Sequence, residues 1–200
     1  MPVTLDAVGH AWPNGTVLFQ DVDRVFAEGT VTGVVGPSGS GKSTLLAILA
    51  GMLRPSHGTV VRPEGCRPLW VFQNPYGVAR RRVLDHVALP FLAAGADRRT
   101  ADAHALEVLD RFRLGHRAHA RYAELSGGEA QRLVLARGIA SGPDLMLVDE
   151  PTAQLDRVTA AEVNDAIGAL AASGTVVVVA THDDDTRDAC GSVLDLGRYR

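Results

Sequence analysis

Residues 36–44 read GPSGSGKST, and this stretch constrains the fold of the chain more than any other. It matches the pattern GxxxxGK[ST] of a phosphate-binding loop. The segment VTGVV at 31–35 predicts a strand before the loop, and STLLAILAG at 43–51 predicts a helix after it. Glycines allow the backbone N–H groups to turn toward phosphate oxygens, and the helix N-terminus adds a positive end. The alternative, a Gly/Ser turn that only caps a helix, is disfavoured because strand, loop, lysine and helix follow in the required order.

Lys42 is the only lysine among the 20 lysine and arginine residues of the chain. A loop that surrounds β- and γ-phosphates needs a compact charge on a thin stem, and the guanidinium of arginine is wider and suited to bidentate contacts. The hydroxyl of Ser43 is expected to ligate Mg²⁺. The predicted nucleotide site in this loop comprises Gly36, Pro37, Ser38, Gly39, Ser40, Gly41, Lys42, Ser43 and Thr44.

The remaining apolar patterns predict an α/β fold. Continuous apolar runs at 69–72, 145–148 and 175–180 are typical of parallel strands that are buried on both faces. Residues 3–8 and 16–26 alternate with period two, and Asn14-Gly15 predicts a hairpin between antiparallel strands. Helical patterns cover 42–51, 99–114, 128–141 and 157–172. We predict one domain over 1–200, with a P-loop NTPase core and its parallel sheet, an N-terminal antiparallel β subdomain, and a helical subdomain inserted at about 74–132.

Polar side chains follow three of these apolar runs. The strand LMLV is followed by Asp149, which is suited to hold Mg²⁺, and Glu150, which is placed to polarise an attacking water. His182 and Gln73 also follow strands, at the sheet edge where α/β proteins bind ligands. His182 is a candidate contact for the γ-phosphate, and Gln73 for Mg²⁺ or the attacking water. The alternatives are surface acids at a strand end, a structural histidine and a polar loop residue.

The segment LSGGEAQR at 125–132 predicts a second anion site. Ser126, Gly127 and Gly128 open a helix, and glycines at a helix start expose backbone N–H groups to an anion. One nucleotide does not need two such helices. The economical interpretation is that this site serves a nucleotide bound to a second subunit.

These motifs together resemble the ATP-binding cassette (ABC) ATPases, over essentially the whole chain. GPSGSGKST, Gln73, LSGGE, LMLVDE and the Thr-His pair that ends in His182 follow one another in the order and spacing of that family. The resemblance implies a head-to-tail homodimer with two ATP molecules between the P-loop of one subunit and Ser126–Gly128 of the other. It implies for Lys42, Ser43, Gln73, Asp149, Glu150 and His182 the roles argued above.

Two further residues enter through the resemblance. The segment AQLD at 153–156 occupies the family's D-loop, where Asp156 matches and Ala-Gln replaces the commoner Ser-Ala. Trp12 lies where the family places an aromatic ring against adenine. The alternative for Trp12 is a side chain packed on the hairpin. Both ATP sites of a homodimer are expected to be competent, since Glu150 and the SGG helix are intact.

Two functions compete for such an ATPase: a transporter subunit, and a cytosolic ABC ATPase that acts on DNA or ribosomes. The second kind typically carries two cassettes or a long coiled-coil insert, and no sustained heptads occur between Gln73 and Ser126. The transporter is therefore favoured. A nucleotide or small-molecule kinase would leave LSGGE unexplained.

The segment VLDHVALPFLAAG at 83–95 resembles the lipoprotein-release and macrolide-export group of transporters. Arg80, Arg81 and Arg82 replace the residues that are usual just before it, in a segment that faces the membrane partner in this family. They are either a solvated turn or part of an altered docking face for a membrane permease. We expect no regulatory domain after His182.

The composition of the chain limits the kinds of partner and the cellular location that we expect. The formal net charge of −3 gives no basic footprint, so no nucleic-acid partner is expected. Cys66 and Cys190 form no CxxC pair and are expected to be idle thiols in a reducing compartment. No apolar run is long enough to span a bilayer. We expect a cytoplasmic protein that lies on the inner face of the cell membrane through its partner.

Overall fold

The parallel sheet predicted from the apolar runs is present in the computed structural model, which describes residues 2–172 and 174–199. Its five strands lie in the order β5-β6-β7-β3-β8. They are β3 (Val31–Val35), β5 (Pro68–Val71), β6 (Leu145–Asp149), β7 (Val176–Ala180) and β8 (Ser192–Asp195). β8 was not predicted, because a four-residue strand next to a bend carries too little pattern to be distinguished from a loop.

Strand β6 shows why the parallel strands are apolar throughout. Leu145 and Leu147 belong to a core cluster with α1 (Lys42–Leu49). Met146 and Val148 point to the other face, into a cluster with α4 (Gly127–Ala140) and α5 (Arg157–Ala171). All four side chains are fully buried, as expected for a strand covered on both faces.

The predicted antiparallel subdomain is a sheet of three strands in the order β2-β1-β4. They are β1 (Val3–Ala11), β2 (Val17–Phe26) and β4 (His57–Val61). The hairpin prediction is confirmed: the Trp12 N–H donates to the Thr16 carbonyl at 2.9 Å across the turn, and Gly15 has a φ of 85°. β4 was missed because its side chains are mostly exposed at the sheet edge, so the segment lacks an apolar alternation.

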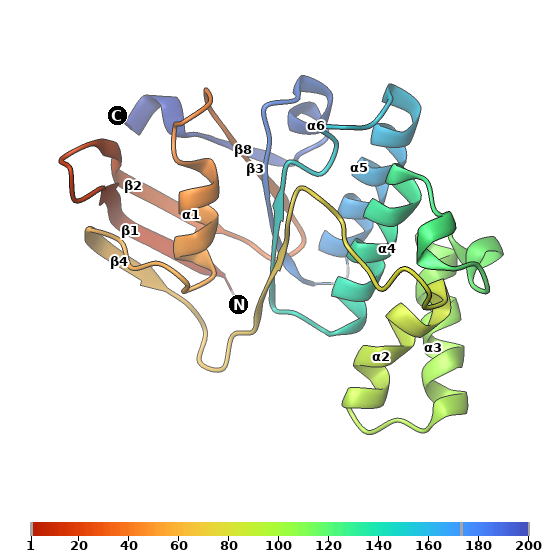
Figure 1. Ribbon diagram of the computed structural model, residues 1–200. Helices are drawn as coiled ribbons and strands as arrows, with labels where there is room; N and C mark the ends of the chain where they lie inside the picture. The colour runs from red at the N-terminus through yellow and green to blue at the C-terminus, as the bar shows by residue number, and fades with distance from the viewer. Residues whose placement is uncertain (1, 173, 200) are drawn as a thin grey trace.

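Helices cover the two faces of the parallel sheet (Figure 1). α1 lies between the two sheets, while α4 and α5 lie on the opposite side of the parallel sheet. The pair α2 (Val83–Ala93) and α3 (Arg98–Arg111) forms the end of the molecule away from the antiparallel sheet. Short helices complete the fold: two 3-10 turns at Gly115–Arg117 and Tyr122–Glu124, α6 (Asp184–Asp188), and a 3-10 turn at Leu196–Tyr199.

The helical insertion differs in detail from the prediction. Residues 74–82 contain no helix, and the first helix after β5 is α2, which begins at Val83. The boundary predicted at 132 falls inside α4, which runs unbroken from Gly127 to Ala140. α4 therefore begins among the inserted helices and ends against the parallel sheet. Among the described residues, no helix combines the length and the apolar character needed to cross a membrane.

Candidate functional site

The phosphate-binding loop follows β3 and ends at α1, as the sequence predicts. Gly36, Gly39 and Gly41 have φ values of 144°, 77° and 95°, which L side chains rarely adopt. At Gly41 a Cβ would also lie 2.9 Å from the ring of Phe19. The loop conformation thus requires glycine at these positions, and Gly41 is the residue that precedes the first turn of α1.

Lys42 lies in the cleft with its side chain turned back over the loop. Its Nζ donates a hydrogen bond to the Gly36 carbonyl at 3.0 Å and lies 3.9 Å from Oε1 of Glu150. Only 10% of the side chain is exposed. The ammonium is therefore held in the centre of the loop, where three N–H donors can exchange their present acceptors for phosphate oxygens.

Glu150 and His182 contact each other directly. The Nδ1 atom of His182 lies 2.8 Å from Oε2 of Glu150, and the backbone N–H of His182 donates to the same oxygen at 3.2 Å. Glu150 itself has a φ of 46°, and its N–H donates to the carbonyl of Ala180 on β7. The strand order places β6 beside β7, so residues 32 positions apart in sequence meet at one sheet edge.

Asp149 lines the same cleft as Glu150. The pKa of its carboxyl is raised, mainly by burial and further by the nearby Glu150 carboxylate. The Ser43 hydroxyl and the charge of Lys42 oppose this rise. Its Oδ1 atom is buried and has no hydrogen-bond partner among the described residues. A buried carboxylate oxygen that is left unpaired beside a hydroxyl is a site that favours a cation.

These residues line one cleft of about 420 Å³. The predicted residues that line it are Trp12, Ser38, Gly39, Gly41, Lys42, Ser43, Thr44, Gln73, Asp149 and Glu150. Gly36, Pro37 and Ser40 shape the loop without lining the cleft, and His182 reaches it through Glu150. Leu18 of β2 also lines the cleft and was not predicted, because nothing in the strand pattern distinguishes it from a packing residue.

Trp12 lies at the end of β1 beside the cleft. Its side chain is 43% exposed, and its ring packs edge-on against His10 with centroids 4.9 Å apart. The ring thus contacts the antiparallel subdomain while much of it stays exposed to a ligand. The two interpretations offered by the sequence, an adenine contact and a ring packed on the hairpin, are compatible in this arrangement.

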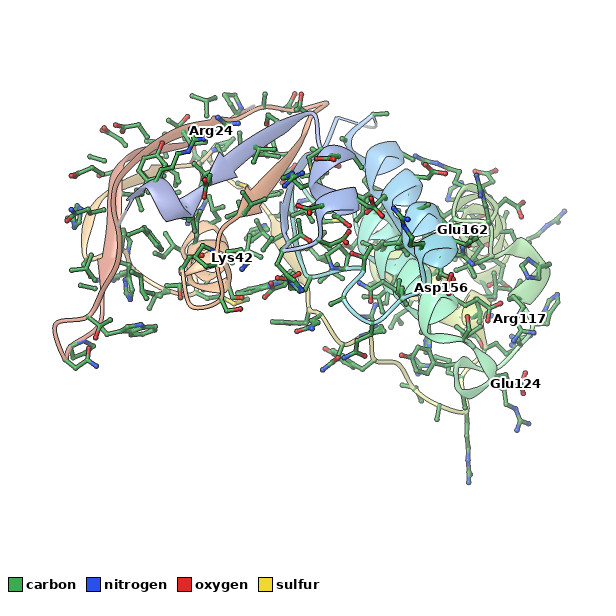
Figure 2. All side chains as sticks on the ribbon, turned by 90° about the horizontal axis from the view of Figure 1, so that it is seen from above. Arg24, Lys42, Arg117, Glu124, Asp156 and Glu162 are labelled. Atoms are coloured by element: carbon green, nitrogen blue, oxygen red, sulfur yellow. The ribbon has the colours of Figure 1, made fainter. Side chains whose placement is uncertain are left out.

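Ser126, Gly127 and Gly128 do not line the cleft. The Ser126 hydroxyl accepts from the Glu129 N–H at 3.2 Å, and the Glu129 carboxylate accepts from the Ser126 N–H at 2.8 Å. Asp156 caps α5 and is held by Thr159, whose hydroxyl donates to it at 2.7 Å. That bond is the main reason that the pKa of Asp156 is lowered. Figure 2 shows Lys42 and Asp156 in different halves of the molecule.

A larger depression of about 650 Å³ lies at the other edge of the sheet. Arg67, Asp144 and Thr175 line it, and they precede β5, β6 and β7 rather than follow them. Arg67 is already engaged by the Asp144 carboxylate and by the Gly142 carbonyl. Ligands of open α/β sheets bind at the carboxyl ends of the strands, so the cleft at Lys42 is the candidate site.

Known proteins that resemble this chain are described as ABC transporter components or ATP-binding cassettes. A family model described as ABC transporter matches residues 19–153. The lipoprotein-releasing system ATP-binding protein LolD 2 of Caulobacter vibrioides is 37% identical over 198 residues, which cover 91% of this chain and 82% of that protein. A dimeric structure of a post-hydrolysis state of the ATP-binding cassette MJ0796 bound to ADP and Pi superposes with a TM-score of 0.79 at 27% identity, covering 98% of this chain and 95% of the other.

Some relatives are longer than this chain. An uncharacterized ABC transporter ATP-binding protein of Mycobacterium tuberculosis is 40% identical over 185 residues, which cover 85% of this chain and 56% of the relative. The chain thus spans little more than half the length of that protein.

Proposed function

This chain belongs to the ABC transporter family and is an ATP-binding domain of that family. We propose that it binds and hydrolyses ATP as one half of a dimer that drives a membrane permease. The observation that carries the proposal is the composition of the cleft. It combines the lysine of a phosphate-binding loop with two adjacent carboxylates at the end of a buried strand. A site with only the loop would bind a nucleotide; the carboxylates supply what hydrolysis needs in addition.

The oxygen donors in the cleft suit Mg²⁺. Ser43, Gln73 and Asp149 line the same cleft, and the Oδ1 atom of Asp149 is buried without a partner among the described residues. Hydroxyl, carboxylate and amide oxygens are the ligands that Mg²⁺ takes, usually together with phosphate oxygens. We assign Ser43, Gln73 and Asp149 to the metal, which would supply neutralisation of phosphate charge.

The other residues of the site have separate roles in ATP binding and hydrolysis. Lys42 and the loop N–H groups hold the β- and γ-phosphates. Glu150 accepts a proton from the attacking water, because its carboxylate lines the cleft and is only 14% exposed. His182 orients Glu150 through the 2.8 Å contact, and we assign it to the γ-phosphate. Trp12 supports the adenine ring.

The separation of Ser126–Gly128 from the cleft supports a dimer. The first turn of α4 is capped by its own Ser126 and Glu129, yet Ser126 and Gly127 remain exposed to solvent. A helix N-terminus that is exposed and glycine-rich is suited to bind phosphate, and the cleft at Lys42 of the same subunit is not lined by it. A second copy placed head to tail would bring its ATP to Ser126–Gly128 and its D-loop near Asp156.

This function predicts that phosphate release by the purified protein depends on Mg²⁺. Chelation of the metal should abolish turnover because the phosphate charge is no longer neutralised, and added Mg²⁺ should restore it. A malachite-green assay in the presence and absence of chelator measures both. Turnover that persists without a divalent cation would contradict the assignment of Ser43, Gln73 and Asp149.

The docking face for the permease is proposed to include Arg80 and Arg81. Both side chains are exposed in the segment between Gln73 and α2, and Tyr76 and Val78 of the same segment are 68% and 55% exposed. Arg82 is exposed as well, but its guanidinium is bound to the Asp85 carboxylate at 3.0 Å. Docking here would hold the chain on the cytoplasmic side of the membrane through its partner.

A charge reversal tests this face. We expect Arg80→Glu with Arg81→Glu to leave the ATPase activity of the isolated protein unchanged and to weaken assembly with the permease, since like-charge contacts at an interface are costly. Arg82 is left in place because its loss would remove one of the two arginine partners of Asp85 at the start of α2. The two measurements are phosphate release by the purified chain and co-purification with the permease from membranes.

The matched control makes the same change of charge on α3, with Arg99→Glu and Arg111→Glu. If the control weakens assembly as much, net charge and not the face is responsible. Unchanged assembly in the Arg80/Arg81 variant would identify these residues as a solvated turn.

A further inference from the structure

Arg113 occupies a backbone position that ordinarily selects glycine. It follows the end of α3 with a φ of 55°, in the left-handed region that a side chain with a Cβ disfavours. Helices commonly end with one residue in this conformation, and that residue is usually glycine. The arginine found here makes side-chain contacts that a glycine could not make.

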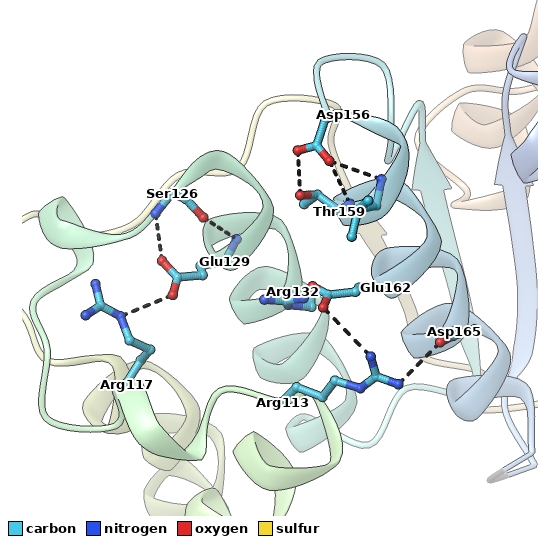
Figure 3. Close-up of polar contacts among 10 residues, drawn as sticks. Arg113, Arg117, Ser126, Glu129, Arg132, Asp156, Thr159, Glu162 and Asp165 are labelled. Atoms are coloured by element: carbon cyan, nitrogen blue, oxygen red, sulfur yellow. Dashed lines mark hydrogen bonds and ion pairs between the residues drawn. The ribbon is translucent and has the colours of Figure 1, made fainter.

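The Arg113 guanidinium joins the end of α3 to α5 (Figure 3). Its Nη1 lies 3.8 Å from Oε1 of Glu162, and its Nη2 lies 3.5 Å from Oδ2 of Asp165. The other carboxylate oxygen of Glu162 pairs with Arg132 of α4, a side chain that is only 8% exposed. Arg113 and Arg132 thus share the Glu162 carboxylate. Asp165 adds a second carboxylate, so two positive charges are balanced by two negative charges.

α5 also supports the first turn of α4. A Cβ at Gly128 would lie 1.9 Å from Cγ2 of Thr159, so the two helices touch there without any room for a side chain. Arg132 and Glu162 make the next contact, four residues along α4 and three along α5. The position of Ser126–Gly128 is therefore set by where α4 lies on α5.

A second ion pair, at the N-terminus of α4, does not involve α5. Nε of Arg117 lies 3.2 Å from Oε1 of Glu129, the residue that caps α4 together with Ser126. Arg117 lies in the helical insertion and Glu129 lies in the first turn of α4, so their pair does not connect the insertion to α5. Arg113 instead connects the inserted helices to α5, which packs on the parallel sheet.

We propose that Arg113 is a positioning residue that fixes the N-terminus of α4 for the nucleotide of a second copy of this chain. The proposal rests on the ATP dimer put forward above. Arg113 lies outside the phosphate-binding cleft of its own subunit, so it affects the site across the interface and not the one beside Lys42.

The test replaces Arg113 by glycine in the Glu150→Gln protein, where ATP is bound without turnover. Glycine relieves the left-handed backbone and removes the ion pairs, so the melting temperature should stay within a few degrees of the parent. ATP-dependent dimerisation, measured by analytical ultracentrifugation, should weaken roughly tenfold, because each ion pair is modest and the dimer contains the tie twice. Binding of a fluorescent ATP analogue to the monomer should be unchanged.

Hydrogen exchange of the monomer gives a readout that needs no dimer. The amides of residues 126–129 should exchange faster in Arg113→Gly than in the parent, while those of α1 should not change. Arg111→Ala is the matched control, an exposed arginine two positions away that makes no ion pair with any described residue.

The outcomes separate the two proposals. If the Glu150→Gln protein itself does not dimerise with ATP, the proposed function fails, and hydrogen exchange still decides the role of Arg113. Dimerisation and exchange like those of the parent would overturn that role. A parallel loss of melting temperature and of nucleotide binding in the monomer would also overturn it, because Arg113 would then serve general stability.

Discussion

Replacement of Glu150 by glutamine is expected to reduce ATP turnover by about 10²–10⁴-fold, the usual contribution of a general base. The side chains are nearly isosteric, so the carboxamide oxygen can still accept from the His182 N–H as the carboxylate does at 3.2 Å. The amide is a far weaker proton acceptor than the carboxylate, so the chemical step slows while the cleft keeps its shape. Single-turnover phosphate release measures the loss, and equilibrium binding of ATP should be retained.

The same variant should accumulate the dimer. With ATP no longer consumed, size-exclusion chromatography in ATP and Mg²⁺ should show a species of twice the monomer mass that disappears with ADP. Glu107→Gln, an equivalent change at an exposed position of α3, should behave like the unmodified protein. A Glu150→Gln protein that hydrolyses ATP well, or that remains a monomer at high concentration, would contradict the assigned role.

Lys42→Arg is expected to lose most of its ATP binding even though the charge is kept. The Lys42 Nζ sits 3.0 Å from the Gly36 carbonyl in a loop that leaves 10% of the side chain exposed. A guanidinium is wider and planar, so it cannot occupy the same point among the phosphates. Loss of charge-assisted hydrogen bonds worth about 1.5–3 kcal/mol corresponds to affinity that is roughly 10- to 150-fold weaker.

Isothermal titration with ATP measures this loss directly. Arg54→Lys, at an exposed position shortly after α1, is the control for an exchange of the two residue types outside the loop. The melting temperature of Lys42→Arg should remain close to that of the parent. Near-normal ATPase activity in Lys42→Arg would show that the loop does not hold phosphate as proposed.

The sequence predicts the parts of the fold that depend on local pattern. The phosphate loop, the buried strand that contains Leu147 and the hairpin at Gly15 were all identified because each has a distinctive local chemistry. β4 and β8 were missed because both are short and pair with strands that lie far away in the sequence. β4 is also largely exposed. Such strands form because an existing sheet edge offers hydrogen bonds, which no local pattern reveals.

The site was predictable in composition more than in geometry. The order of the motifs placed Asp149 and Glu150 with the loop, and the cleft contains them. That Glu150 turns toward His182, with a φ of 46°, follows from the adjacency of β6 and β7 and not from either motif. The role of Arg113 could not be predicted either. Neither its left-handed backbone nor its two carboxylate partners can be recognised from the surrounding sequence.

The single lysine makes the cleft chemically addressable. Within these 200 residues, the only side-chain amine is the one bound to the Gly36 carbonyl, and every other basic side chain except histidine is a guanidinium. Acylating reagents and amine-reactive cross-linkers would therefore attach to no other side-chain amine than the one in the cleft, and a bound triphosphate would shield it. Surface immobilisation through side-chain amines would consume that same group, whereas coupling through Cys66, which lies outside the cleft, would spare it.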